Sequence, residues 1–276
     1  MDIIRSMKSQ PKPLKAYNNP EFMDSVEARE VRVLAEFLEP KKRLQEHKIV
    51  DTLVFFGSAR INSKKDAAAK LKIAQGKFKA GHPELEQAKR IHEMSRYYED
   101  AVKLSKMLTL WAKDISKNKA VQRYIVCSGG GPGIMEAANK GAHLAKGESV
   151  GFNISIPFEQ NSNAYITKKL NFEFHYFFIR KYWFAYMAKA LIVFPGGFGT
   201  LDELFEVLTL CQTHKMTKSI PILIYGKSYW DRIINIEEMI NLGTVSRKDL
   251  SLFHYSDDPE DAFNYLTKEL VKRFGK

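Results

Sequence analysis

From residue 123 onward the chain repeats one unit, in which a short apolar run, a glycine-bearing turn and a helix-like stretch follow one another. A similar apolar run stands earlier, at 52–56. Apolar runs without polar alternation are typical of strands buried on both faces of a parallel sheet. Their alternation with helices predicts a doubly wound α/β fold, with helices covering both faces of the sheet. The expected strands are TLVFF, RYIVCS, SVGFNISIP, KALIVF and PILIY.

The segments outside this repeat are expected to be irregular or helical. Residues 1–20 contain several prolines and no periodicity, which predicts an irregular arm. A helix is expected from about Glu21 until Pro40 interrupts it. Apolar residues recurring every three or four positions between 85 and 115 predict one long amphipathic helix, preceded by a shorter one across 64–80.

Charge and cysteine content restrict the partners and the compartment. The net charge is +11, but the basic residues alternate with acids inside helix-like segments, which is typical of solvated helix faces. No recognised nucleic-acid-binding module is present, so no nucleic-acid partner is expected. Cys127 and Cys211 lie in apolar stretches, as expected for reduced thiols in a cytoplasmic protein. We see neither a signal-peptide pattern nor an apolar run of membrane-spanning length, so no membrane partner is expected.

Three of the expected strands end in glycine, at Gly57, at 129–131 and at 196–197. In a parallel sheet these turns lie along one edge, where ligands bind. Two of them lead into helices, and a helix N-terminus without side-chain obstruction binds anions. Gly199 lets the backbone approach a phosphate, and the Thr200 hydroxyl adds a donor. The turns lack the lysine of a P-loop and the GxGxxG pattern of dinucleotide-binding proteins, so they indicate a phosphorylated ligand other than ATP or NAD.

Acidic residues follow the turn at 196–200, and a basic pair precedes it in the sequence. Glu203 stands three residues after Thr200 and is expected to lie beside whatever the turn binds. Asp202 is typical of an acid that favours a helix start. The adjacent pair Arg180 and Lys181, in an aromatic segment, is the best candidate for the cations that hold an anion there.

Four stretches resemble the LONELY GUY family of cytokinin-activating phosphoribohydrolases: GSAR at 57–60, SGGGPGIMEAANKGA at 128–142, FHYFFIRK at 174–181 and PGGFGTLDELFE at 195–206. The resemblance covers about residues 50–270. The wording of the motifs is similar to that of the larger bacterial branch of the family, and many bacterial members carry the label "lysine decarboxylase". It implies a single Rossmann-like nucleotide-binding domain. We therefore expect one domain over 21–276, with a helical insertion at about 62–118 that the minimal family lacks.

The resemblance also implies a reaction and a site. The family hydrolyses the N-glycosidic bond of nucleoside 5'-monophosphates, such as AMP or the N6-prenylated form, to free base and ribose 5-phosphate. It implies catalytic roles for Arg180 and Glu203, no cofactor or metal, and a homodimer or higher homo-oligomer. The substrate-binding positions that it implies are Ser58, Gly130, Gly131, Gly133, Met135, Glu159, Lys181, Gly196, Gly197, Phe198, Gly199 and Thr200.

Other functions stay open at this point. A nucleotide-binding carrier or regulator without catalysis has no need of Glu203 beside an anion. A true lysine decarboxylase requires a lysine that binds pyridoxal phosphate, and Lys181, the lysine inside the motifs, suits anion binding better. A dehydrogenase lacks its fingerprint. The base stays open among purines, pyrimidines and cytokinins.

Overall fold

The computed structural model describes residues 12–117, 120–157, 161–216 and 218–275. In these residues seven strands form one sheet in the order β4-β3-β2-β1-β5-β6-β7, and every neighbouring pair is parallel. This Rossmann-like α/β arrangement confirms the predicted fold class. The strands are β1 (Thr52–Phe56), β2 (Ile125–Ser128), β3 (Ser149–Ile154), β4 (Asn171–Phe174), β5 (Ala188–Val193), β6 (Ile222–Tyr225) and β7 (His254–Ser256).

The strand order places a switch point between β1 and β5. The chain adds β2, β3 and β4 in turn on one side of β1, and then returns to build β5, β6 and β7 on the other side. A crevice opens at the carboxyl edge where the direction of building reverses. The five expected strands correspond to β1, β2, β3, β5 and β6. The sequences of β4 and β7, NFEF and HYS, contain no continuous apolar run, so the apolar pattern did not predict them.

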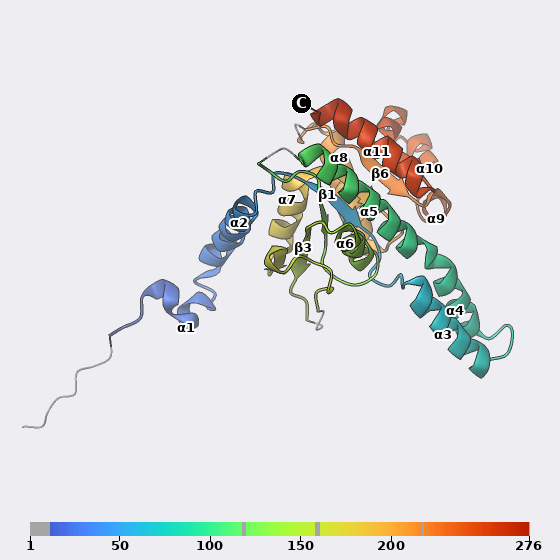
Figure 1. Ribbon diagram of the computed structural model, residues 1–276, viewed down its shortest axis with the longest axis horizontal. Coiled ribbons are helices and arrows are strands. Elements are labelled where there is room, and N and C mark those ends of the chain that lie inside the picture. Colours follow the sequence, from blue (N-terminus) through green and yellow to red (C-terminus); the bar gives the residue numbers. More distant parts are fainter. Residues whose placement is uncertain (1–11, 118–119, 158–160, 217, 276) are drawn as a thin grey trace, which may run out of the picture.

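Helices cover both faces of the sheet (Figure 1). One apolar layer joins α7, α8 and the end of α2 to the sheet, and the other joins α5, α6 and α11 to it. The helices are α1 (Pro20–Met23), α2 (Arg29–Glu46), α3 (Lys64–Lys77), α4 (Pro83–Met94), α5 (Arg96–Ser116), α6 (Ile134–Leu144), α7 (Phe177–Met187), α8 (Phe198–Gln212), α9 (Lys227–Ile233), α10 (Ile236–Asn241) and α11 (Pro259–Phe274). No described helix is both long and apolar enough to cross a membrane.

Residues 62–117, the described part of the expected insertion, contain three helices with two different placements. α3 and α4 pack on each other and extend away from the sheet at the lower right of Figure 1. α5 packs against the sheet and α6, and it forms the crossover between β1 and β2. The prediction of one helix over 85–115 is wrong, because α4 ends at Met94 and α5 begins at Arg96. Between them, the Ser95 hydroxyl donates a hydrogen bond to the His92 carbonyl at 2.6 Å.

Pro40 does not interrupt its helix, contrary to the prediction. α2 continues through it to Glu46. Proline has no N–H for the carbonyl four residues earlier, which here belongs to Glu36. The indole Nε1 of Trp183, on α7, donates to that carbonyl at 3.0 Å instead. The Glu36 carboxylate accepts the backbone N–H of His175 at 2.7 Å, just before α7. The helix therefore tolerates Pro40 because a tertiary contact replaces the missing donor.

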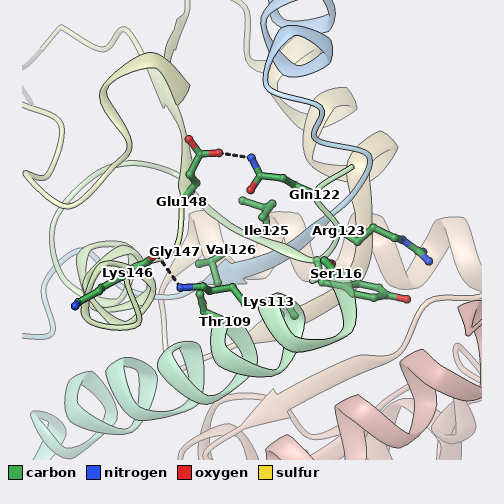
Figure 2. Close-up of a pocket in the computed structure, with 12 residues that line it drawn as sticks. Thr109, Lys113, Ser116, Gln122, Arg123, Ile125, Val126, Lys146, Gly147 and Glu148 are labelled. Atoms are coloured by element: carbon green, nitrogen blue, oxygen red, sulfur yellow. Dashed lines mark hydrogen bonds between the residues drawn. The ribbon is translucent and has the colours of Figure 1, made fainter. Parts of the chain in front are cut away.

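A cavity of about 200 Å³ lies at the amino edge of β2 and β3 (Figure 2). Several of its polar groups are already paired with one another or with nearby protein atoms. Gln122 Nε2 donates to Glu148 at 2.5 Å, and Lys113 Nζ donates to the Lys146 carbonyl at 3.1 Å. This cavity is at the edge opposite to the one where α/β sheets bind ligands.

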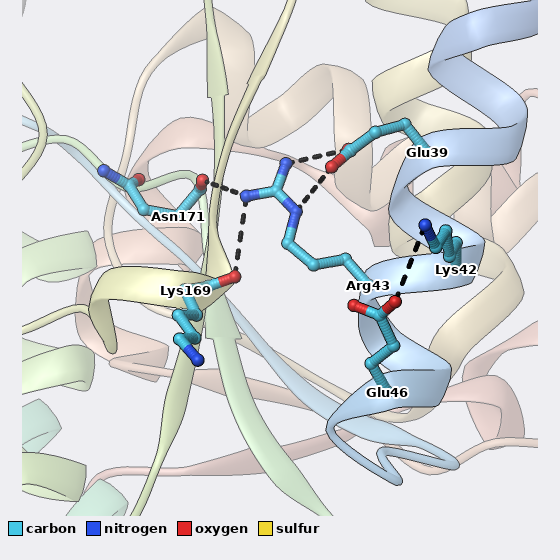
Figure 3. A network of polar contacts seen from close by, with 6 residues as sticks. All are labelled: Glu39, Lys42, Arg43, Glu46, Lys169 and Asn171. Atoms are coloured by element: carbon cyan, nitrogen blue, oxygen red, sulfur yellow. Dashed lines mark hydrogen bonds and ion pairs between the residues drawn. The ribbon is translucent and has the colours of Figure 1, made fainter.

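An arginine network attaches α2 to the edge strand β4 (Figure 3). The Arg43 guanidinium donates to both carboxylate oxygens of Glu39, at 2.6 and 2.7 Å, and to the Asn171 carbonyl at 2.9 Å. Its Cζ also lies 4.0 Å from the centre of the Phe172 ring. A planar, always-charged guanidinium can serve a carboxylate, a carbonyl and an aromatic face together.

Candidate active site

A cleft of about 710 Å³ opens at the carboxyl edge of the sheet, at the switch point between β1 and β5. Its walls are the turn after β1, Gly129 after β2, the end of β3, the turn from β5 into α8, and part of α9. Its size is that of pockets that hold small-molecule ligands. The site expected from the glycine-ended strands therefore corresponds to a single cleft.

The cleft brings together most of the residues implied by the resemblance. Those that line it are Ser58, Met135, Arg180, Gly196, Gly197, Phe198, Gly199, Thr200 and Glu203. Four others do not line it: Gly130, Gly131, Gly133 and Lys181. Glu159 lies outside the described residues.

The N-terminus of α8 offers unpaired backbone donors to the cleft. Gly197 is the N-cap residue and provides no side-chain cap. The first amide to pair is that of Leu201, which donates to the Gly197 carbonyl at 3.0 Å. The N–H groups of Phe198, Gly199 and Thr200 meet no acceptor within the described ranges. Such a helix start, combining free donors with the positive end of the helix dipole, is suited to binding an anion.

Arg180 projects from α7 into the cleft, where two backbone carbonyls orient it. Its Nε donates to the Phe152 carbonyl at 2.7 Å, and its Nη2 lies 3.5 Å from the Gly129 carbonyl. Burial lowers the pKa of the guanidinium, whereas the nearby Glu203 raises it. Arg180 forms no ion pair with a carboxylate in the part of the chain that the structure describes, so its charge is available to an anionic ligand.

Glu203 is a buried carboxylate in the first turn of α8. Its side chain borders the cleft, yet the residue is only 7% exposed. Burial raises the pKa of Glu203 to about 7, although Arg180 and Lys181 act to lower it. Among the described residues, no group donates a hydrogen bond to its carboxylate. A carboxyl group that titrates near neutral pH inside a cleft is suited to acid–base and electrostatic catalysis.

Lys181 is held in two ion pairs beside the cleft. Its Nζ lies 3.0 Å from Asp202 and 2.8 Å from Glu206. Burial lowers the pKa of this lysine, but its hydrogen bonds to Glu206 and Asp202 outweigh burial and raise it overall. Asp202 therefore fixes Lys181 as well as standing at the helix start. A raised pKa also disfavours the neutral amine that Schiff-base chemistry with pyridoxal phosphate needs.

The other glycines of the turn after β2 do not line the cleft and are enclosed by neighbouring residues. Gly130 and Gly133 have positive φ angles of 77° and 71°. A Cβ at Gly130 would collide with the Asn153 amide, and one at Gly133 would collide with the backbone of Ser58. The first amide of α6, that of Ile134, already donates to the Ser58 carbonyl at 3.1 Å. This turn is therefore closed by packing, whereas the turn before α8 is open.

Sequence reasoning did not predict several residues that line the cleft: Arg60, Asn153, Phe177, Tyr229 and Ile233. Two local signals were present. Asn153 interrupts an otherwise apolar strand near its carboxyl end, and β6 is followed by a glycine, as the three recognised strands are. Tyr229 contacts the turn before α8, because its hydroxyl donates to the Gly196 carbonyl at 2.9 Å. In the described chain, no group of three His, Cys, Asp or Glu side chains is placed to hold a metal ion.

Residues 135–266 match a family model described as "Possible lysine decarboxylase". A cytokinin riboside 5'-monophosphate phosphoribohydrolase of Arabidopsis thaliana is 29% identical over 133 residues, which cover 47% of this chain and 60% of that protein. A relative from Oryza sativa subsp. japonica is 30% identical over 124 residues, covering 44% of this chain and 49% of its own length. The chain thus spans about half of the length of these curated relatives.

Among solved structures, the Moco carrier protein of Chlamydomonas reinhardtii is similar over 80% of this chain and 98% of its own, with 16% identity and a TM-score of 0.46. The range matched by the family model contains Arg180, Glu203 and the turn into α8. The family-model match and the two curated relatives show that the chain is similar to LONELY GUY proteins over about half of its length.

Proposed function

We propose that the protein hydrolyses the N-glycosidic bond of a nucleoside 5'-monophosphate and releases a free base and ribose 5-phosphate. The observation that carries the proposal is Glu203, a buried carboxylate with a pKa of about 7 and no hydrogen-bond donor among the described residues. It stands within one cleft beside Arg180 and the open N-terminus of α8. The name of the Arabidopsis relative supports a cytokinin riboside 5'-monophosphate as the substrate. AMP is the second candidate, because it shares the purine riboside 5'-monophosphate structure.

The two parts of the cleft suit the two ends of such a nucleotide. The free N–H groups at the start of α8 and the charge of Arg180 suit a phosphate. The wall also carries three apolar side chains, which are Ile154 at the end of β3, Met135 on α6 and Phe177 on α7. Apolar and aromatic side chains suit a planar base. A substrate held at both ends would bring its ribose near Glu203.

The chemistry needs a negative charge beside C1'. When the C–N bond breaks, its electron pair leaves with the base and positive charge develops on the ribose. The Glu203 carboxylate stabilises this charge, and it accepts a proton as the water oxygen bonds to C1'. The departing base nitrogen takes up one proton, which equals the one that Glu203 accepts from water. With a pKa of about 7, Glu203 can both accept and return a proton near neutral pH.

We also propose a homodimer or larger homo-oligomer, located in the cytoplasm. Aromatic side chains are exposed along α7 and at the start of α8: Phe177, Phe178, Tyr182 and Tyr186 are 42–56% exposed, and Phe198 is 93% exposed. Grouped exposed apolar side chains mark association surfaces. The free thiols of Cys127 and Cys211 are compatible with a reducing compartment.

Chromatography of a nucleoside monophosphate panel, after incubation with the protein, tests the proposal. We expect free base and ribose 5-phosphate from AMP or a close relative, and a far slower reaction of the unphosphorylated nucleoside. Equal rates on adenosine and AMP would contradict a role for the anion site. Tight AMP binding without turnover would favour the non-catalytic carrier instead.

A further inference from the structure

The glycine turn after β2 is held by a buried polar network. The backbone N–H of Gly130 donates to Ser128 Oγ at 3.1 Å, and Ser128 Oγ donates to Asn139 Oδ1 at 2.7 Å. Asn139 Nδ2 in turn donates to the Val150 carbonyl at 3.3 Å, on β3. Both Ser128 and Asn139 are completely buried. Buried polar groups of this kind specify one geometry, because each loses free energy if its partner moves.

Asn163, in the segment between β3 and β4, closes this network. Its Nδ2 donates to the carbonyls of Gly130 and Gly131 at 3.0 and 3.1 Å, and to Asn139 Oδ1 at 2.9 Å. Its backbone N–H also donates to the Gly130 carbonyl at 2.8 Å. Asn163 Oδ1 accepts the backbone N–H of Tyr165 at 3.1 Å, which orients the amide. A primary amide supplies donors on one side and an acceptor on the other, and this position uses both.

The turn held in this way positions Arg180. The Gly129 carbonyl lies 3.5 Å from Arg180 Nη2, and a Cβ at Gly129 would collide with the guanidinium, so Arg180 rests directly on the turn. The other anchor, the Phe152 carbonyl on β3, is rigid within the sheet. The direction of the guanidinium therefore depends on where Gly129 lies.

We propose that Asn163 is a positioning residue of the cleft: it fixes the turn at 129–131 and, through Gly129, the Arg180 guanidinium. Its effect on turnover rests on the proposed function, whereas its effect on Arg180 does not. Asn163→Ala removes the three side-chain donor contacts. Asn163→Ser keeps one donor and should behave as an intermediate. Asn161→Ala is the matched control, because Asn161 lies in the same segment and is exposed.

The first test is a double-mutant cycle in AMP hydrolysis. Asn163→Ala should reduce kcat/KM by about 10- to 100-fold, since a displacement of about 1 Å at a reacting centre can cost 10²-fold. In the Arg180→Ala background the same substitution should cost less than about twofold, because the group through which it acts is gone. A reduction of kcat/KM by the same factor in both backgrounds would overturn the proposal and indicate a general structural defect. If Asn163→Ala does not yield folded protein, Asn163→Ser gives the same comparison.

The second test needs no substrate. Phenylglyoxal reacts with accessible guanidinium groups, and peptide mass spectrometry measures its rate at Arg180. We expect Arg180 to react several-fold faster in Asn163→Ala than in the wild type or in Asn161→Ala, with the other arginines unchanged. An unchanged rate at Arg180 would overturn the proposal. If the wild type hydrolyses no nucleotide, the proposed function fails, but this measurement still decides the role of Asn163.

Discussion

Replacing Glu203 with glutamine should change stability and turnover in opposite directions. Glu203 as a whole residue is 7% exposed, and burial raises the pKa of its carboxyl group from 4.5 to about 7. Each pKa unit corresponds to about 1.4 kcal/mol, so ionising Glu203 within the fold costs about 3 kcal/mol more than ionising it in the unfolded chain. Glutamine has nearly the same shape and cannot ionise. Glu203→Gln therefore removes this cost.

The stabilisation should depend on pH with a definite sign. Below the unfolded pKa of 4.5, the carboxyl group is neutral in both states and the two proteins should be equally stable. As the pH rises from 4.5 through about 7, the unfolded wild type releases a proton that the folded wild type retains, so the wild type loses stability. At pH 8 the full difference of about 3 kcal/mol should apply, which corresponds to a rise in Tm of roughly 6 °C or more.

Turnover should fall although stability rises. Losing a positioned carboxylate typically reduces kcat by about 10²–10⁴-fold, whereas AMP binding should survive because the variant lacks only a negative charge. The measurements are thermal unfolding across the pH range, single-turnover kinetics and calorimetric AMP binding. The matched control is Glu206→Gln, one turn further along α8, which loses an ion pair with Lys181 and should not gain stability. A gain in Tm that is equal at pH 5 and pH 8, or near-normal turnover of Glu203→Gln, would refute the reasoning.

Three further predictions follow from the same geometry. Arg180→Ala should weaken AMP binding by about 10- to 100-fold as well as reduce turnover, because it removes a charged partner of the anion; calorimetry that shows unchanged affinity would contradict this. Trp183→Phe should lower the free energy of unfolding by about 1–3 kcal/mol, measured in urea, because the Glu36 carbonyl loses the donor that Pro40 cannot supply; an unchanged value would mean that the bond is dispensable. Light scattering at micromolar concentration should give the mass of a dimer or larger assembly, and a strictly monomeric mass would exclude it.

The local sequence determined the fold class and the edge of the sheet that holds the cleft. Continuous apolar runs such as TLVFF and KALIVF need burial on both faces, and only a sheet covered by helices on each side provides that. Glycines within two residues of the ends of those runs then mark the carboxyl edge, where parallel strands end together. The position of Glu203 in the first turn after such a glycine turn was also evident from spacing alone, because helix geometry is local.

Contacts between distant segments decided the rest, and no local pattern carries them. Pro40 remains inside a helix because Trp183, on α7, donates a hydrogen bond to the Glu36 carbonyl, which Pro40 leaves without a donor. Lys181 was assigned to the ligand by its position beside Arg180, yet the turn of α7 directs it to Asp202 and Glu206 instead. The contacts of Asn163 with the glycine turn join two loops that are more than thirty residues apart in the sequence. The pKa of Glu203 likewise follows from its burial, which exists only once α7, α8 and the sheet have packed together.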